Sequence, residues 1–193
     1  MYVPPHFAET DPGVLGALIR AHPLGTWVVP ADGTLIVNHI PFLLRDDGTL
    51  VGHVARANDV WKRLGAESVV VFQGAESYIS PSWYASKREH GKVVPTWNYA
   101  VVHAHGTPRA IEDNDWLYAL VTALTDSQES QRAEPWKVTD APDAYVRAAL
   151  SAIVGIEMPV TRLVGKWKAS QNRSEADRSG VAAALPDPKD LVR

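Results

Sequence analysis

The spacing of apolar residues changes several times along the chain, and each change predicts a different element. Residues 11–23 begin with Asp11 and Pro12, a helix N-cap and first-turn pair, and continue with an apolar stripe that Pro23 ends. This pattern predicts a short helix. Apolar residues at three- to four-residue spacing predict two more helices within 113–130 and 140–155. Residues 175–193 are expected to form a short helix or a loop.

Other stretches have the apolar character of strands. Strands are predicted at 25–30, 35–44 and 50–55, and Asp-Gly pairs at 32–33 and 47–48 predict a hairpin turn after each of the first two. The three strands are expected to form a meander. Further strands are predicted at 67–74, 96–106 and 156–171. Because no Gly/Ser-rich or Pro-rich linker divides the chain, we expect one mainly β (α+β) domain, residues 1–193, with peripheral helices.

Composition narrows the functional classes. The chain of 193 residues is 46% hydrophobic and 21% charged and contains no cysteine, which excludes disulfides, thiolate metal sites and a nucleophilic cysteine. Neither a signal peptide nor a membrane span is recognisable, so a cytoplasmic location is expected. The net charge of −3 provides no global attraction to nucleic acid, so any DNA binding requires a local basic patch.

The first candidate site is the segment His53–Trp61, in which Arg56 and Asn58 follow a predicted strand. A guanidinium beside an amide and free backbone N–H groups is a suitable anchor for a phosphate. The alternative is a surface arginine next to an asparagine that caps a turn. The segment alone does not decide between these interpretations.

The second candidate is the segment Ser80–Gly106, which combines tryptophan and tyrosine rings with polar side chains. Such a set suits a planar heterocycle, because ring faces supply contact area and polar groups fix orientation. It equally suits a dimer interface, and both can hold together. His103 and His105 share one face of a strand and could chelate a metal, but no third ligand is evident, and hydrogen-bonded interface histidines are the alternative.

The third candidate is a basic strand end, in which Lys166, Lys168 and Ser170 alternate on one face and Arg173 follows. This end could neutralise a phosphate or approach nucleic acid. The alternative is a solvated edge strand that lysines protect from pairing. Nearby acidic residues dilute the patch.

Six blocks of the sequence together closely resemble the PaiB family, described as FMN-binding negative transcriptional regulators. The blocks are HPLGTWV, NHIPF, GHVARAN, YISPSWY, GKVVPTWNYAVVHAHG and GKWKASQNR, in that order. The resemblance covers almost the whole chain. It implies a split β-barrel of the pyridoxamine-phosphate-oxidase-like type and a homodimer that holds FMN near the interface between its subunits.

The resemblance also implies where FMN lies. The isoalloxazine ring is expected along the strand that contains Asn38, His39, Ile40 and Phe42, whose backbone can reach the pyrimidine edge, whereas Pro41 has no N–H to offer. The phosphate is expected near Arg56 and Asn58, just after the strand that contains His53, which is itself a further expected FMN contact. The remaining expected contacts are Lys168, Gln171 and Asn172 from the last strand, and Trp97 and Asn98 from the partner subunit.

The resemblance leaves three functions open. The first is a flavin-dependent regulator, although no helix-turn-helix pattern is present and a DNA contact would have to use the basic strand end. The second is an FMN-dependent oxidoreductase that acts on an unknown small molecule. The third is a haem-binding split barrel, with His103 or His105 as an axial ligand. For assembly, we expect the strand that contains Val101, His103 and His105 to be partly buried between two copies of the chain.

Overall fold

The computed structural model describes all residues of the chain, Met1–Arg193. The α-helices are α1 (Pro12–Ala21), α2 (Ser86–Glu89), α3 (Asn114–Glu129), α4 (Asp143–Ser151) and α5 (Glu175–Ala184). Short 3-10 helices are η1 (Pro5–Phe7), η2 (Asp59–Arg63), η3 (Pro81–Trp83) and η4 (Val138–Asp140). The strands are β1 (Ala8–Glu9), β2 (Leu24–Ala31), β3 (Thr34–Pro41), β4 (Leu43–Leu44), β5 (Thr49–Ala55), β6 (Ser68–Ile79), β7 (Thr96–Gly106), β8 (Arg109–Ile111) and β9 (Ile153–Lys168). None of the helices combines the length and apolar character that a membrane crossing requires.

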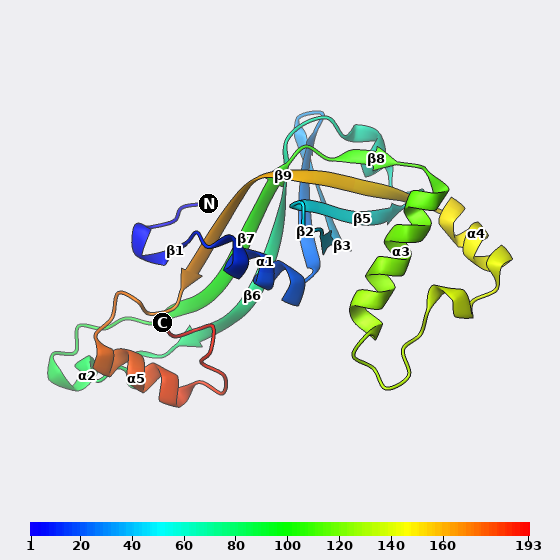
Figure 1. Ribbon diagram of the computed structural model, residues 1–193. Coiled ribbons are helices and arrows are strands. Elements are labelled where there is room, and N and C mark those ends of the chain that lie inside the picture. Colours follow the sequence, from blue (N-terminus) through cyan, green and yellow to red (C-terminus); the bar gives the residue numbers. More distant parts are fainter. The chain divides into compact units, whose positions relative to one another are not determined.

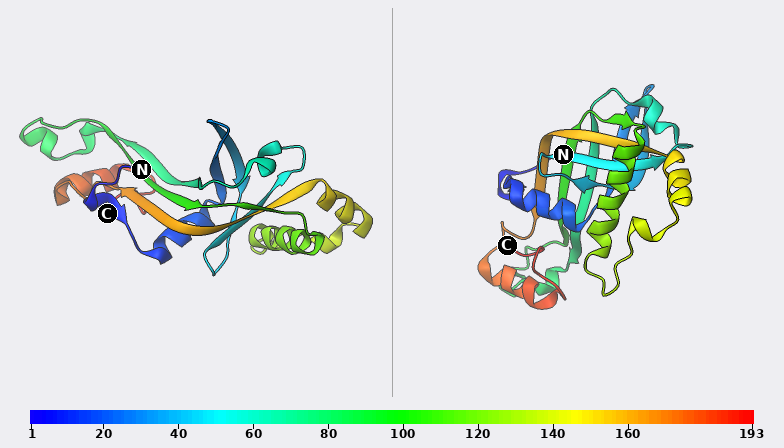
Figure 2. Two further views of the ribbon diagram at one scale, coloured as in Figure 1. Left: turned by 90° about the horizontal axis from the view of Figure 1, so that it is seen from above. Right: turned by 45° about the vertical axis from the view of Figure 1, so that its right-hand side comes forward.

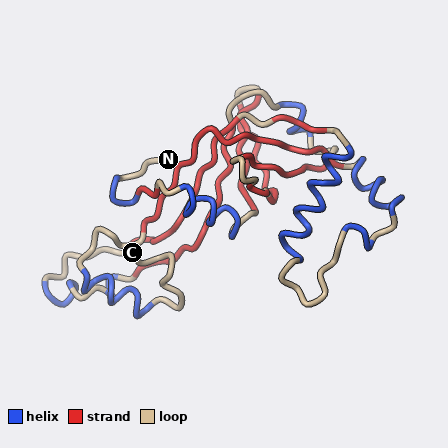
Figure 3. Tube along the Cα trace, viewed as in Figure 1, coloured by secondary structure: helices blue, strands red, loops and turns tan.

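The strands belong to one nine-stranded sheet, in which neighbours follow the order β3-β2-β6-β7-β9-β5-β4, while β1 and β8 also pair with β9 (Figure 1). The pairs of β2 with β3, and of β5 with β9, are antiparallel. Strands make up most of the regular structure, and helices occupy the connections between them (Figure 3). This arrangement confirms the predicted mainly β (α+β) class and each of the predicted long helices.

The chain forms two compact units, which are described separately. The α1 unit contains Met1–His22, Phe72–His103 and Leu163–Arg193. The α3 unit contains Pro23–Val71 and Ala104–Arg162. Strands β6, β7 and β9 each contribute residues to both units. The expectation of a single domain over residues 1–193 stays a prediction.

The first predicted hairpin forms as the sequence indicates. Asp32 and Gly33 both have positive φ angles, 51° and 75°, between β2 and β3. Two such residues in succession give the turn whose twist matches that of antiparallel strands. Pairing then runs without a break from Ala31 opposite Thr34 to Leu24 opposite Pro41.

The predicted meander forms only in part. The predicted strand 35–44 divides into β3 and β4, so the second predicted hairpin joins β4 to β5, and β5 does not pair with β3. It pairs with the two-residue strand β4 on one side and with β9 on the other. Pro41 has no N–H for pairing on the side of β3 away from β2, and the next N–H, of Phe42, donates to the carbonyl of Pro23, which lies opposite it on the β2 side. Gly52 of β5 lies against this segment: a Cβ at Gly52 would be 2.9 Å from the Pro41 carbonyl oxygen. A new hairpin therefore starts after Pro41.

In the α3 unit, helix α3 begins at a capped end and buries one face. The Asp113 carboxylate accepts a hydrogen bond of 2.7 Å from the Trp116 N–H, and Leu117 and Leu120 are fully buried. The Trp116 ring packs against Gly155 of β9, where any side chain would collide with the ring. Helices α3 and α4 lie side by side next to the strands of their unit (Figure 2). The apolar stripe predicted from the sequence is the face that these contacts cover.

In the α1 unit, helix α1 packs on the strands through Leu15, Leu18 and Ile19, which are buried. The predicted N-cap is confirmed, since the Asp11 carboxylate accepts from the Gly13 N–H at 2.8 Å. Helix α5 packs next to η3 around a cluster that includes Ile79, Tyr84 and Val181. The sequence predicted only a short helix or loop there.

Candidate functional site

The α3 unit contains a pocket of about 550 Å³, within the range of about 300 to 1,000 Å³ that is usual for ligand sites. One wall comes from the strand segments around Pro41 and His53, and the other from the end of α3 and the loop after it. The lining residues are Pro23, Leu24, Pro41, Phe42, His53, Leu124, Thr125, Ser127, Gln128, Glu129 and Trp136. Three residues on the strand side, Pro41, Phe42 and His53, belong to the two strand segments from which the sequence predicted FMN contacts.

His53 is the polar group that β5 presents to this pocket. Its side chain is largely buried, and its buried Nδ1 atom has no hydrogen-bond partner within the chain. Burial lowers the pKa of the His53 imidazole below its usual range, because the charged form is the one that loses hydration. The ring is therefore neutral at neutral pH, with one N–H donor and one acceptor nitrogen.

Asn38 and Asn58 meet, although the sequence separates them by twenty residues. The Asn58 side-chain N–H₂ donates to the Asn38 carbonyl oxygen at 2.7 Å, while the buried amide nitrogen of Asn38 has no partner. Asn58 also caps η2 by accepting from the Val60 N–H at 3.2 Å. Asn58 is therefore the turn cap of the alternative interpretation, and it also contacts the strand along which FMN is predicted to lie.

The other two predicted residues of this strand differ in their surroundings. His39 is exposed, and its Nδ1 atom lies 3.0 Å from the Thr26 hydroxyl. Ile40 is buried. The Phe42 side chain is buried with an edge-to-face contact to Trp27, at 6.3 Å between ring centroids. Since the Phe42 N–H donates to Pro23, that N–H is already engaged.

Arg56 has a structural role that the sequence did not reveal. Its guanidinium donates to the backbone carbonyls of Ser151 at 2.9 Å and Ile153 at 3.2 Å, and it pairs with Glu112 at 2.5 Å. The Arg56 carbonyl in turn accepts from the Trp61 indole at 3.1 Å. Arg56 therefore ties the end of β5 to the junction between α4 and β9.

The remaining predicted residues lie in the α1 unit. Trp97 is 53% exposed and makes an edge-to-face contact with Tyr78, at 6.1 Å between ring centroids. Asn98 is fully buried and donates at 2.8 Å both to the Ser170 hydroxyl and to the Leu191 carbonyl. Both N–H groups of the Asn98 amide thus serve to fix the chain around it.

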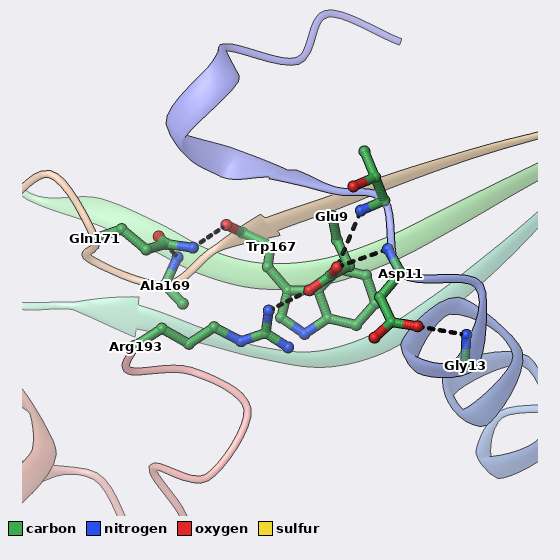
Figure 4. A network of polar contacts seen from close by, with 8 residues as sticks. Glu9, Asp11, Gly13, Trp167, Ala169, Gln171 and Arg193 are labelled. Carbon is green, nitrogen blue, oxygen red and sulfur yellow. Dashed lines mark hydrogen bonds and ion pairs between the residues drawn. The ribbon is translucent and has the colours of Figure 1, made fainter.

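The end of β9 is held by side-chain contacts as well. The Lys168 ammonium donates to the Thr96 hydroxyl and to the Trp97 carbonyl. Burial, and then the neighbouring charges of Lys166 and Arg173, lower the pKa of Lys168. The Gln171 amide donates to the Trp167 carbonyl at 2.6 Å and accepts from the Ala169 N–H at 2.7 Å, as Figure 4 shows. Asn172 is exposed.

The predicted residues therefore form two groups. The α3 unit contains Asn38, His39, Ile40, Phe42, His53, Arg56 and Asn58; the structure joins Asn38 to Asn58 by a hydrogen bond and places Phe42 and His53 on the same pocket wall. Within the α1 unit it brings together Trp97 and Lys168 through a hydrogen bond, with Asn98 and Gln171 supporting the same loop. Sequence reasoning missed the pocket wall made by Gln128, Glu129 and Trp136. The sequence feature that could have indicated this wall is Trp136, a tryptophan within the polar segment after α3.

The basic strand end is less exposed than its sequence suggests. Lys166 is buried, with its ammonium 5.3 Å from the centre of the Tyr99 ring and 5.9 Å from that of Tyr2. The Arg173 guanidinium lies 4.7 Å from the centre of the Tyr84 ring. These cations pack against aromatic rings of their own unit rather than forming an open charged face. No group of three or more potential metal ligands occurs in the chain.

Comparisons with known proteins agree with this geometry. The family described as "Putative FMN-binding domain" matches residues 1–162. The Bacillus subtilis protease synthase and sporulation protein PAI 2 is 33% identical, over 96% of this chain and 89% of that protein. Among solved structures, the flavocytochrome Anf3 from Azotobacter vinelandii is similar with a TM-score of 0.63 and 16% identity, over 94% of this chain and 76% of that one. A FAD- and haem-binding protein from Mycobacterium smegmatis is similar with a TM-score of 0.62 and 18% identity, over 92% and 80%. The predicted split-barrel fold and the predicted cofactor, FMN, are confirmed.

The lowered pKa of His53 predicts a pH dependence of stability. Below the ordinary value of 6.5 the unfolded chain binds a proton at His53 more readily than the folded chain does, so the free energy of unfolding decreases as the pH falls from 7 to 5. In His53→Gln this contribution is lost, and the decrease is expected to be smaller than in the unchanged protein. Urea unfolding at several pH values measures it. The exposed His22 provides the control His22→Gln, and an equal pH slope in all three proteins would contradict the prediction.

Proposed function

The chain belongs to the PaiB family of FMN-binding proteins, and from this premise we propose that it is a cytoplasmic homodimer that holds FMN on strands β3 and β5 and acts as a flavin-dependent regulator. An FMN-dependent oxidoreductase is the second candidate. The observation that carries the FMN site is the pocket in which His53, with a buried unpartnered nitrogen, faces the end of β3.

Two buried polar atoms, one on His53 of the pocket wall and one on Asn38 of β3, fit a flavin ring. An isoalloxazine offers carbonyl oxygens and ring nitrogens along its pyrimidine edge, and these need donors and acceptors in a largely apolar surrounding. The Asn38 amide nitrogen and the His53 Nδ1 atom are buried polar atoms without partners, and leaving such atoms unpaired is costly. FMN contacts to Asn38 and His53 would satisfy both.

Strand β3 supports the same position. It stands at one end of the strand order and pairs with β2 alone, so the backbone groups along its other edge are available. In the proposed site the backbone of His39, which points to this free edge, contacts the pyrimidine edge, whereas the backbone groups of Asn38 and Ile40 point toward β2, so these two residues contribute their side chains. Pro41 has no N–H, and that of Phe42 is engaged, so Phe42 contributes its ring and carbonyl instead.

Arg56 is the proposed anchor of the phosphate, with Asn58 beside it. Three of the guanidinium's five N–H groups are engaged within the chain, and the others can donate to a phosphate. Because its side chain is partly exposed and its position is fixed by two backbone carbonyls, little side-chain entropy is lost on binding. The Glu112 carboxylate opposes this role electrostatically, which makes it a useful test position.

The residues of the α1 unit would complete the site from a second copy of the chain. Trp97 supplies an exposed ring, and the Lys168 ammonium retains a third N–H beyond its two donated bonds. Exposed Asn172 is free to turn toward a ligand, whereas Asn98 and Gln171 hold this loop in place through their own hydrogen bonds. When bound, FMN supplies one- and two-electron redox chemistry.

Replacing Arg56 by Ala tests the phosphate anchor. The loss of a charge-assisted hydrogen bond of about 1.5 to 3 kcal/mol should weaken FMN binding by about ten- to more than a hundredfold. Glu112→Gln should strengthen FMN binding, because it removes a carboxylate beside the phosphate. Fluorescence titration of the apoprotein with FMN measures both effects.

Arg63 is the matched control, because it is a half-exposed arginine of the same unit that pairs with Asp32. Arg63→Ala should leave FMN affinity unchanged. If Arg56→Ala lowers the melting temperature but keeps the FMN affinity of the unchanged protein, Arg56 only ties β5 to β9 and the phosphate binds elsewhere.

The proposed homodimer is supported by apolar side chains on the β2–β3 hairpin and near β7. Leu35 and Val37 on the edge strand β3 are 64% and 53% exposed, and Trp97 at the start of β7 is also exposed. Leu35→Glu should therefore shift the mass in light scattering from dimer toward monomer at micromolar concentration. Val94 is equally exposed and lies in the loop before β7, so Val94→Glu shows whether that loop contributes as well. A monomeric mass of the unchanged protein would contradict the homodimer.

Flavin reduction separates the regulator from the oxidoreductase. A neutral His53 in the pocket has an acceptor nitrogen that can take a proton from a bound substrate as a general base, which favours an enzyme. The engagement of Lys166 and Arg173 with tyrosine rings predicts that direct DNA binding is weak and steeply dependent on salt, so a regulator would act through a partner. Anaerobic addition of NADPH or NADH should leave the oxidised flavin spectrum stable if the protein is a regulator. Rapid bleaching would establish the oxidoreductase, and a haem absorption band would favour the haem-binding alternative.

A further inference from the structure

The α1 unit contains a second, smaller pocket, separate from the residues assigned to FMN. Its volume is about 220 Å³. It lies among α1, strands β6, β7 and β9, and the segment that follows α5. The lining residues are Val14, Ala17, Leu18, Ala21, His22, Gly74, Ala75, Ala100, Trp167, Lys189, Asp190 and Arg193.

Small residues create this pocket. Where α1 crosses β6 and β7, the positions facing the space are Ala17, Ala21, Gly74, Ala75 and Ala100, none of which has a side chain larger than a methyl group. At Gly74 the packing is close, because a Cβ there would lie 2.9 Å from a methyl of Leu18. The helix is therefore held near the strands while the space beside this contact stays open.

Trp167, one of the lining residues, carries a buried donor. The side chain is 3% exposed, and its indole Nε1 has no hydrogen-bond partner within the chain. An indole nitrogen donates but cannot accept, so only an acceptor atom can satisfy it. Leaving a buried donor unpaired costs about 1 to 3 kcal/mol.

The indole ring is also fixed in place. The Arg193 guanidinium lies 4.9 Å from the centre of the Trp167 ring and pairs with the Glu9 carboxylate at 2.6 Å, as Figure 4 shows. The Arg193 N–H donates to the Ala169 carbonyl at 3.0 Å, and Gln171 holds the Trp167 backbone. The donor is thus preorganised, which lowers the entropic cost of binding a ligand.

The charges at the rim indicate the ligand's polar group. Lys189 and Arg193 line the pocket together with the Asp190 carboxylate, and the Glu9 carboxylate pairs with Arg193 from outside the lining. A carboxylate offers an acceptor oxygen to the indole N–H and a negative charge to the two cations, and charge-assisted hydrogen bonds are stronger than neutral ones. The alanine and valine walls favour an apolar body attached to that carboxylate.

We propose that this pocket binds a small carboxylic acid with a compact apolar body, whose carboxylate accepts from the Trp167 indole. The volume is below the range of about 300 to 1,000 Å³ of most cofactor sites, so a complete FMN molecule does not fit. The lining residues all belong to the α1 unit, whereas the proposed isoalloxazine pocket belongs to the α3 unit. The pocket therefore suits a small effector molecule that is distinct from FMN and binds away from the FMN site.

Benzoate is a suitable probe, and benzamide is its neutral counterpart. Both are titrated into the full-length, FMN-saturated protein while the indole N–H resonances are followed by NMR. The Trp167 resonance is identified by its loss in Trp167→Phe. Benzoate should move that resonance downfield and saturate, with an affinity about tenfold or more above that of benzamide, because the amide lacks the charge.

Pocket-filling variants keep the test independent of Trp167. Ala17→Leu places a larger side chain on an exposed turn of α1 that lines the pocket, and it should weaken benzoate binding by about tenfold or more. Ala183→Leu, an exposed position on α5 outside the pocket, is the matched control and should bind as the unchanged protein does. Lys189→Gln should weaken benzoate binding and leave benzamide binding unchanged.

Three results would overturn the proposal. One is a Trp167 resonance that does not move at any benzoate concentration. Another is equal binding of benzamide and benzoate, which would remove the carboxylate from the assignment. The third is benzoate binding that Ala17→Leu leaves intact, which would place the ligand elsewhere.

Discussion

The structure depends on one long strand, β9, and on the requirement that its backbone groups be paired. Its sixteen residues pair with β1, β5, β7 and β8, so strands from both ends and the middle of the sequence are ordered by this one segment. Glu157, near the start of this strand, is buried and pairs with Arg45 and Arg109, which is favourable only because two cations replace the carboxylate's lost water. Gly155 and Gly165 lack side chains where Trp116 and Leu15 pack against the strand.

The proposed FMN site depends on β9 indirectly. Arg56 follows β5, and its guanidinium donates to carbonyls at Ser151 and Ile153, at the point where β9 begins. These two hydrogen bonds join the end of β5 to the start of β9. They also fix the position of the guanidinium that is proposed to hold the phosphate. One arginine can both hold these segments together and contact a ligand, because its guanidinium has more N–H donors than the contacts within the chain use.

The polar side chains of the α1 unit are mostly engaged in holding backbone in place. Asn98 fixes two chain segments, Gln171 fixes the end of β9, and Lys168 fixes the start of β7. The Trp167 indole nitrogen is buried as well and, like the Tyr84 hydroxyl, makes no hydrogen bond within the chain, but Trp167 also lines the smaller pocket. This contrast within one unit distinguishes a structural polar group from one that is suited to a ligand.

Interactions between neighbouring residues predict the local elements, and short motifs predict the family. Capping residues, Asp-Gly turns and apolar spacing act between near neighbours, so they define α1, the first hairpin and α3 without knowledge of the fold. The family motifs identified the split barrel and FMN. Tertiary structure alone decided that β5 pairs with β9 rather than β3, because Pro41 has no N–H for pairing on the side of β3 away from β2 and the new partner lies about a hundred residues away. Tertiary structure also decided which polar side chains already have partners within the chain. In the sequence Arg56, Asn98 and Lys166 look available for a ligand, because folding alone brings their hydrogen-bond and ring partners next to them.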